Sequence, residues 1–96
     1  MENFRNNKEK NRFELEVNGQ TAIIDYMLNT QNIMFLNHTE VPQELEGKGV
    51  GSRLVKNTLE YIRDHGYKLA PICPFVSAYL RRHPEWQDLL SAGYKV

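Results

Sequence analysis

The sequence predicts a small α/β domain, in which a mixed, twisted and mostly antiparallel sheet contains one parallel β-α-β unit and is followed by C-terminal helices. Three observations support this fold class. An alternating segment followed by Asn-Gly indicates an antiparallel hairpin near the N-terminus. A segment of helical period lies between two apolar segments, which is the order of a β-α-β unit. The length of 96 residues suits one domain.

The predicted hairpin comes first. In residues 12–17, apolar side chains alternate with two glutamates, which is the period of a half-buried strand. Asn18 and Gly19 supply the positive φ angles of a tight turn, and residues 21–28 are rich in strand-forming side chains. Residues 1–11 are polar and rich in asparagine and charge, so we expect an N-terminal tail, or alternatively a late entry into the first strand, and a single domain over residues 12–96.

The parallel unit follows. Residues 33–38 begin apolar on both faces, which predicts a strand inside the sheet. Apolar side chains then recur at helical spacing in residues 50–65, and Gly66 can cap this helix. Residues 67–73 form a short strand. A right-handed crossover would make the two strands parallel neighbours.

Two further helices are expected at the C-terminus. Phe75, Val76, Tyr79 and Leu80 lie at helical offsets in residues 74–82. The pair His83-Pro84 interrupts the pattern, and the proline can open a last short helix that runs to residue 90.

Composition narrows the function. Apolar residues make up 41% of the chain and charged residues 25%, as in ordinary globular proteins. Twelve basic residues balance twelve acidic ones, so no net field favours nucleic acid or an anionic membrane. No apolar run has the length of a membrane span or a signal core, and one cysteine fits a reducing compartment. We expect a cytoplasmic monomer or weak dimer.

The most informative segment is the glycine-rich stretch of residues 46–52, between a strand end and a helix start. Glycines let the backbone approach a ligand closely, and the first amides of a helix lack internal partners, so phosphates are the expected occupants. Lys48 and Arg53 would add positive charge. The spacing differs from a Walker loop and from a dinucleotide fingerprint. A purely structural turn remains an alternative.

This loop, Glu46-Gly47-Lys48-Gly49-Val50-Gly51, resembles the acyl-CoA loop of the GNAT superfamily of acetyltransferases. The family pattern is Gln or Arg, two residues, Gly, one residue, then Gly or Ala, and it lies between the central strand and the long helix. Glu46 departs from it. The resemblance implies that loop amides hold the coenzyme A diphosphate, and that the preceding strand end offers backbone groups to the thioester arm. The implied acetyl-CoA-binding residues are Glu40, Val41, Glu46, Gly47, Lys48, Gly49, Val50, Gly51 and Ser52.

Other segments resemble a particular short GNAT-like subfamily. With them, the resemblance covers roughly residues 12–90. They are the stretch 38–42 before the loop, and Cys73-Pro74-Phe75-Val76, Tyr79 and His83-Pro84-Glu85 after it. Members of that subfamily lack the two helices that usually follow the first strand, and the Asn-Gly turn leaves no room for them here. The resemblance therefore implies an open or shallow acceptor side.

Acetyl transfer to an amine needs a base for the ammonium and an acid for the departing thiolate. By resemblance, Tyr79 matches a tyrosine that protonates the coenzyme A sulfur, and Cys73 could carry the acyl group transiently. Glu40 leaves the strand just before the loop and could be the base. Each residue also has a purely structural interpretation. Tyr79 could be a core aromatic, Cys73 a buried small apolar side chain, and Glu40 an ordinary exposed carboxylate.

His38 and His83 could also act as bases near neutral pH, but either could have a purely local structural role. The cysteine and the three histidines have no recognised ligand spacing, so we expect no metal site. The leading hypothesis is an acetyl-CoA-dependent N-acetyltransferase acting on an unknown small or protein amine. The alternatives are an acetyl-CoA-binding sensor without transfer, and a partner-binding domain that uses Trp86 and Tyr94.

Overall fold

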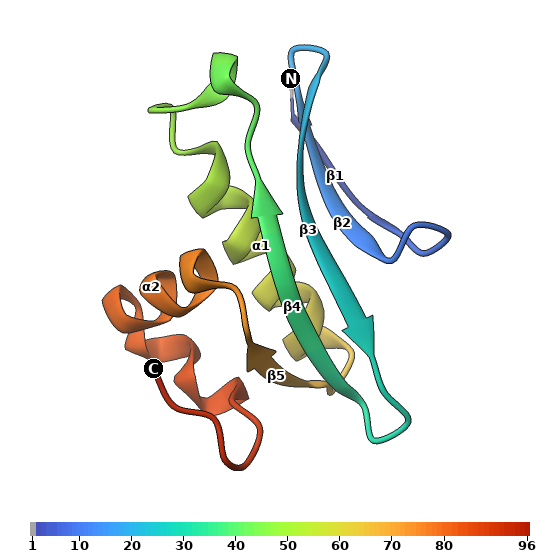
Figure 1. Cartoon of the computed structure of the whole chain (residues 1–96), viewed down its shortest axis with the longest axis vertical. Coiled ribbons are helices and arrows are strands. Elements are labelled where there is room, and N and C mark those ends of the chain that lie inside the picture. The colour runs from blue at the N-terminus through green and yellow to red at the C-terminus, as the bar shows by residue number, and fades with distance from the viewer. Residues whose placement is uncertain (1) are drawn as a thin grey trace.

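The structure, a computed structural model, describes residues 2–96 and contains one five-stranded sheet (Figure 1). The sheet is mixed: neighbouring strands are antiparallel, except that the last two are parallel. This confirms the predicted sheet. The strands, in their order across the sheet, are β1 (Glu2–Asn7), β2 (Arg12–Val17), β3 (Gln20–Leu28), β4 (Ile33–Glu40) and β5 (Lys68–Pro71).

The predicted helices are confirmed. Helix α1 (Val50–Asp64) joins β4 to β5 and completes the β-α-β unit, and α2 (Pro74–Arg82) follows β5. The last predicted helix is a 3₁₀ helix, η2 (Pro84–Leu89), and a short 3₁₀ turn, η1 (Gln43–Leu45), lies before the glycine loop. None of the helices in residues 2–96 has the length and apolar character needed to cross a membrane.

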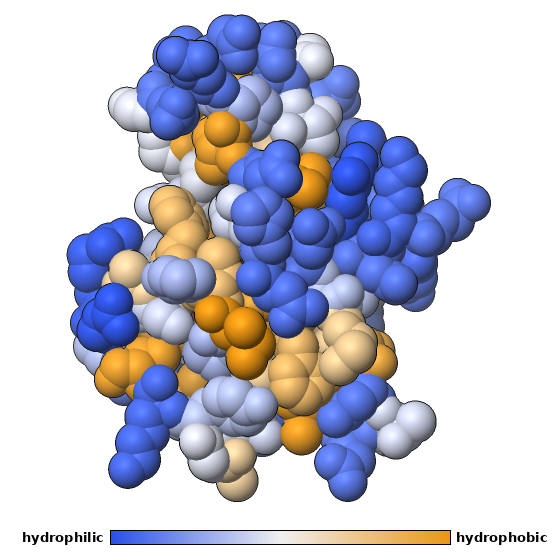
Figure 2. Space-filling view, in the orientation of Figure 1, coloured by the Kyte–Doolittle hydropathy of each residue, from blue (hydrophilic) through white to orange (hydrophobic). Residues whose placement is uncertain are grey.

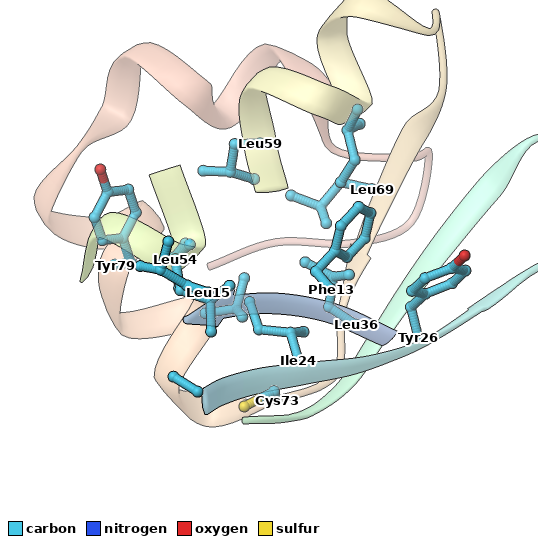
Figure 3. Close-up of a cluster of buried hydrophobic side chains, with 14 of the residues drawn as sticks. Phe13, Leu15, Ile24, Tyr26, Leu36, Leu54, Leu59, Leu69, Cys73 and Tyr79 are labelled. Atoms are coloured by element: carbon cyan, nitrogen blue, oxygen red, sulfur yellow. The ribbon is translucent and has the colours of Figure 1, made fainter. Parts of the chain in front are cut away.

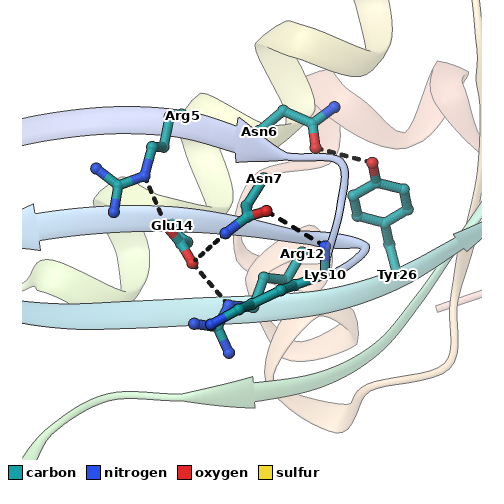
Figure 4. A network of polar contacts seen from close by, with 7 residues as sticks. All are labelled: Arg5, Asn6, Asn7, Lys10, Arg12, Glu14 and Tyr26. Carbon is teal, nitrogen blue, oxygen red and sulfur yellow. Dashed lines mark hydrogen bonds and ion pairs between the residues drawn. The ribbon is translucent and has the colours of Figure 1, made fainter.

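The N-terminus differs from its prediction. Residues 2–7, expected in a polar tail, form the edge strand β1, which pairs with all of β2. Phe4 stacks on Phe13 with ring centroids 5.7 Å apart. The polar side chains also have partners: Arg5 and Asn7 both donate hydrogen bonds to Glu14 (Figure 4). The tail prediction is wrong because these partners lie on another strand, where sequence composition cannot reveal them.

The hairpin of β2 and β3 is confirmed. Asn18 and Gly19 join the strands with φ angles of 51° and 81°. No helix separates the two strands, as the resemblance implied. Helix-free hairpins of this kind leave one face of the sheet open, and the opposite face of β2 and β3 packs under α1.

A β-bulge in β4 sets which side chains face the helices. The register pairs Tyr26 with Leu36 but Asp25 with His38, so Asn37 is the extra residue. Beyond the bulge, Thr39 pairs with the buried Ile24, and Glu40 pairs with Ile23. Because paired residues share a face, Thr39 points toward the helices and Glu40 points to the open face.

One hydrophobic core lies between the sheet and the helices (Figure 3). It unites the inward side chains of β2, β3 and β4 with the apolar stripe of α1 and with Val76 and Leu80 of α2. Helix α1 packs on four of the strands, whereas α2 packs on β4, β5 and α1. The core therefore fixes the start of α1 beside the end of β4 and the start of α2, where the glycine loop lies.

Candidate functional site

A cleft of about 460 Å³ opens where the end of β4, the glycine loop and the first turns of α1 and α2 meet. Most of its wall comes from the segment that the sequence singled out. The lining residues are Thr39, Val41, Leu45, Glu46, Gly47, Gly49, Val50, Gly51, Ser52 and Phe75. The predicted loop therefore borders a real concavity.

The loop presents backbone amides at the start of α1. Gly49 is the N-cap residue, with a φ angle of 74°, and no side chain caps the helix. A residue with a Cβ would be strained in this left-handed conformation. The uncapped first turn leaves N–H groups without intrahelical partners, and the helix dipole adds partial positive charge. This is an anion-binding arrangement.

Gly51 shapes the cleft in a different way. A Cβ built at Gly51 would lie 2.7 Å from Cζ of Phe75, so the absence of a side chain allows α1 and α2 to approach at this point. The Phe75 ring is 39% exposed and lines the cleft. Helical spacing grouped Phe75 with buried residues, but the structure places it at the mouth of the cleft.

The strand β4 has a free edge beside the cleft. Its pairing with β5 ends at Leu36 and Pro71, and one further hydrogen bond runs from the Cys73 N–H to the Leu36 carbonyl at 2.8 Å. Within residues 2–96, positions 38–40 pair with β3 on one side and with no strand on the other. Backbone groups on this edge can bind an extended ligand.

Cys73 lies at the closed end of that free edge. It is the N-cap residue of α2, its side chain is 5% exposed, and its Sγ is 3.2 Å from Oγ1 of Thr39. Thr39 in turn lines the cleft. The thiol is thus buried directly behind the wall of the cleft, in contact with a hydroxyl that could orient it.

Tyr79 lies elsewhere. It is buried in α2, stacks on His83 with ring centroids 4.1 Å apart, and does not line the cleft. Burial, with the nearby carboxylates of Glu85 and Glu60, raises the pKa of the Tyr79 hydroxyl. Figure 3 shows Tyr79 at the edge of the buried cluster, with its hydroxyl pointing away from Cys73. The structure therefore does not bring the two predicted catalytic residues together.

Glu40 and His38 are on the open face. His38 Nε2 is 2.9 Å from a carboxylate oxygen of Glu40, and both side chains are more than half exposed. Neither lines the loop cleft; Glu40 lines a second cleft on the other side of the sheet. Figure 2 shows this open face, where apolar side chains gather over β4 and β5 and polar side chains cover β1 and β2.

Two basic side chains, Arg53 and Lys48, lie near the loop, and Arg53 already has partners within the protein. Arg53, in the first turn of α1, donates to the Lys48 carbonyl at 2.9 Å and pairs with Glu2 at 2.7 Å. The Lys48 side chain is exposed. Arg53 therefore links the edge strand β1 to the loop, and its guanidinium retains donors for an anion in the cleft.

Comparisons with known proteins agree with this geometry. The model of the GCN5-related N-acetyltransferase family matches residues 12–89. The chain belongs to the GCN5-related N-acetyltransferase family. A GCN5-like protein of Staphylococcus aureus, solved by NMR in solution, is similar over 97% of this chain and 90% of its own, with 28% identity and a TM-score of 0.72. The resemblance inferred from the loop and the predicted fold class is confirmed.

Vertebrate relatives of this GNAT chain exist as well. Protein NATD1 of Mus musculus is 27% identical over 79 residues, which cover 80% of this chain and 72% of the mouse protein. Protein NATD1 of Homo sapiens is also 27% identical over 79 residues, covering 80% of this chain and 70% of the human protein. The match extends over most of each protein.

Three cleft residues of this GNAT domain were absent from the predicted set: Thr39, Leu45 and Phe75. Thr39 faces the helices because of the bulge in β4, and no sequence pattern predicted that bulge. Leu45 is an isolated apolar residue within a polar segment, and that isolation could have identified it as an anchor. Phe75 was missed because its helical spacing grouped it with the apolar residues Val76, Tyr79 and Leu80. Of the residues predicted to bind acetyl-CoA, Glu40 and Lys48 do not line the cleft, and neither do the predicted catalytic residues Cys73 and Tyr79.

Proposed function

We propose that this GNAT domain binds acetyl-CoA in the loop cleft and transfers the acetyl group to an amine. The supporting observation is the coincidence of the family loop, an uncapped helix start and a cleft in one place. The amides of Gly47, Gly49, Gly51 and Ser52, with the charge of Lys48 and Arg53, would hold the diphosphate. The Val41 backbone and the free edge of β4 would hold the arm.

The residues also fit such a donor in their chemistry. The cleft combines glycine amides at the loop with apolar Val41 and Phe75 and with the Thr39 hydroxyl. A diphosphate joined to a flexible amide-bearing arm needs the same combination of groups. When bound, acetyl-CoA would supply an activated acetyl thioester, and the chain would hold it with β4 and exclude water with Phe75.

The test is calorimetric titration of the purified chain with acetyl-CoA, with coenzyme A and ATP as controls. Gly47 lines the cleft and Gly93 does not, yet both have positive φ angles and open space around a built Cβ. Gly47→Trp and Gly93→Trp therefore carry similar backbone strain. We expect wild type and Gly93→Trp to bind at micromolar concentrations and Gly47→Trp to lose binding. Equal affinities in all three proteins would refute the proposal.

Cys73 is the proposed catalytic side chain on the helix side of β4. Its Sγ contacts Oγ1 of Thr39, which lines the cleft, and from there it would accept the acetyl group or position the thioester. Cys73→Ser replaces the thiol with a much weaker nucleophile but keeps a hydrogen-bonding contact with Thr39, whereas Cys73→Ala removes both. If Cys73 carries the acetyl group, mass spectrometry after incubation with acetyl-CoA detects an added acetyl group at Cys73 in wild type, and both variants lose transfer. Full activity of Cys73→Ala assigns the residue to packing.

The placement of Tyr79 favours a second candidate, an acetyl-CoA-binding sensor that does not transfer. In that case the cleft binds acetyl-CoA and no amine is acetylated. The partner-binding hypothesis gains less support, because Trp86 is half-buried under Arg63 and Tyr94 packs its edge on Phe35. A screen of amines with a thiol-release assay separates the first two functions.

A further inference from the structure

A second cleft, of about 270 Å³, lies on the open face of the sheet, and we name it the outer cleft. Its lining residues are Arg12, Thr21, Ile23, Glu40, Val41 and Pro42. Val41 lines both this cleft and the loop cleft, so the two meet at the end of β4 from opposite sides. A second substrate would have to approach the free edge of β4 from the side that the donor leaves open.

The outer cleft has a negative wall on β4. The register places Glu40, Ile23 and Glu14 in one row across three strands, so Ile23 forms the floor between the outer two. The Glu40 carboxylate is 66% exposed and its neighbour is the His38 imidazole at 2.9 Å. A carboxylate beside an imidazole can bind a primary ammonium and accept its proton.

The opposite wall is positive. Two guanidiniums, those of Arg5 and Arg12, flank the single carboxylate of Glu14, at 2.6 Å and 2.7 Å (Figure 4). Asp25, the register partner of Arg12, adds a second carboxylate on the same face, so the positive side of the cleft is the Arg12 guanidinium itself. Arg12 donates to Glu14 through Nε, and a guanidinium has five N–H donors, so donors remain for a second carboxylate. Of the three, Arg12 lines the cleft.

The Glu14 carboxylate keeps Arg12 in this position. Burial by itself would raise the pKa of Glu14, but the hydrogen bonds from Arg12, Asn7 and Arg5 outweigh burial and lower that pKa. The carboxylate is thus charged at neutral pH. Between the two walls the floor and end are formed by Ile23, Val41 and Pro42, which suit an aliphatic stem. The walls stand two strand spacings apart, about 10 Å between backbones.

We propose that the outer cleft is the acceptor site and that it takes a small amino acid, with the primary ammonium on Glu40 and the carboxylate on Arg12. This inference rests on the proposed acetyl transfer. In direct transfer, with Cys73 positioning the thioester, the amine nitrogen bonds to the acetyl carbonyl carbon and the bond from that carbon to the coenzyme A sulfur breaks. The ammonium loses two protons: one ends on the coenzyme A thiol, and the other passes through Glu40 to water.

Charge excludes the main alternatives. A diamine, or a lysine in a basic peptide, would place its second cation against the Arg12 guanidinium, which lines the cleft. A simple alkyl amine would leave the Arg12 donors without a partner. The expected preference is therefore for a molecule with one ammonium and one carboxylate on a short stem.

The first experiment compares acceptors of matched length with the wild-type chain and saturating acetyl-CoA, by release of the thiol. The set is 4-aminobutanoate, 4-aminobutanamide and 1,4-diaminobutane. A series of amino acids from glycine to 6-aminohexanoate then varies the length of the stem between the ammonium and the carboxylate. We expect kcat/KM for the best amino acid to exceed that of its amide by about tenfold or more, the effect of one charge-assisted hydrogen bond. An amide or diamine used as well as the acid overturns the inference.

Two variants locate the effect. Arg12→Lys keeps a positive charge near Glu14 but loses the planar fork, and we expect a higher KM for the amino acid and little preference over the amide. Glu40→Gln, on an exposed side chain, should lower kcat/KM for all acceptors. The matched controls are Arg81→Lys and Glu9→Gln, which lie outside both clefts. Unchanged acceptor preference in Arg12→Lys contradicts the inference.

Binding measurements separate this inference from the proposed function. If the chain fails to bind acetyl-CoA, the proposed function and the acceptor-site inference are both refuted. If it binds acetyl-CoA, the same acceptors are titrated into the coenzyme A complex and followed by amide chemical shifts. Shifts at Ile23, Glu40 and Arg12 with the amino acid, and weaker shifts with the amide, support the outer cleft even without turnover. Donor binding with no response of these amides to any amino acid overturns the acceptor assignment alone.

Discussion

The two clefts that meet at Val41 are built in different ways. The loop cleft is made largely of backbone: glycine residues and the start of one helix, all within a short stretch of chain. The outer cleft is made of side chains from β2, β3 and the end of β4, which are far apart in sequence. A backbone site depends on local conformation, whereas a side-chain site depends on sheet register. The two should therefore fail under different substitutions.

The largest expected effect comes from the ion cluster beside the outer cleft. Glu14→Gln would leave the guanidiniums of Arg5 and Arg12 without their carboxylate. Removing one partner of a fully buried ion pair costs 3–5 kcal/mol, and because both arginines are partly exposed we expect a loss of about 2 kcal/mol in the free energy of unfolding. Urea denaturation at pH 7 measures it, with the exposed Glu9→Gln as control. An unchanged free energy would remove the structural basis of the outer cleft.

The same cluster predicts a pH dependence. The folded-state pKa of Glu14 is lowered below its ordinary value of 4.5, so the unfolded chain binds the proton more tightly. The contribution of Glu14 is therefore complete above about pH 4.5 and is lost as the pH falls through the lowered pKa. The stability difference between wild type and Glu14→Gln should shrink from pH 7 to pH 3. A constant difference would assign it to packing.

A smaller effect is expected where β1 touches the loop cleft. Arg53→Gln removes a positive charge beside the loop, and we expect acetyl-CoA affinity to fall about fivefold, since the group is exposed and screened by salt. Glu2→Gln frees Arg53 from its partner and should raise affinity about twofold, in the opposite direction. Calorimetric titration at two salt concentrations measures both, with Arg81→Gln as control. Changes of equal sign would show that the pair does not act on the loop.

The smallest expected effect concerns Tyr79. Tyr79 does not line the loop cleft, so Tyr79→Phe should leave acetyl transfer within about twofold of wild type. Steady-state rates at saturating acetyl-CoA provide the measurement, and a thermal melt checks the fold. A loss of tenfold or more would restore the catalytic role that the family resemblance implied, and would require α2 to move when the donor binds.

Much of the fold was predictable because its signals are local. The Asn18-Gly19 turn, the helical period of α1 and the glycine loop each specify backbone conformation within a few residues. The loop also identified most of the cleft for the same reason. The strand β1 was missed, since its stability comes from pairing with β2 and from contacts to Glu14, none of which are visible in residues 2–7 alone.

The sequence by itself determined the α/β class, the β-α-β unit and the position of the amide-rich loop, because glycine placement and hydrophobic period act through neighbouring residues. The tertiary structure decided which side chains share a face. The Asn37 bulge turns Thr39 toward Cys73 and Glu40 toward Ile23. Helix packing places Phe75 against Gly51 and keeps Tyr79 out of the lining of the loop cleft. These outcomes depend on register and close packing between distant segments, which no local pattern encodes.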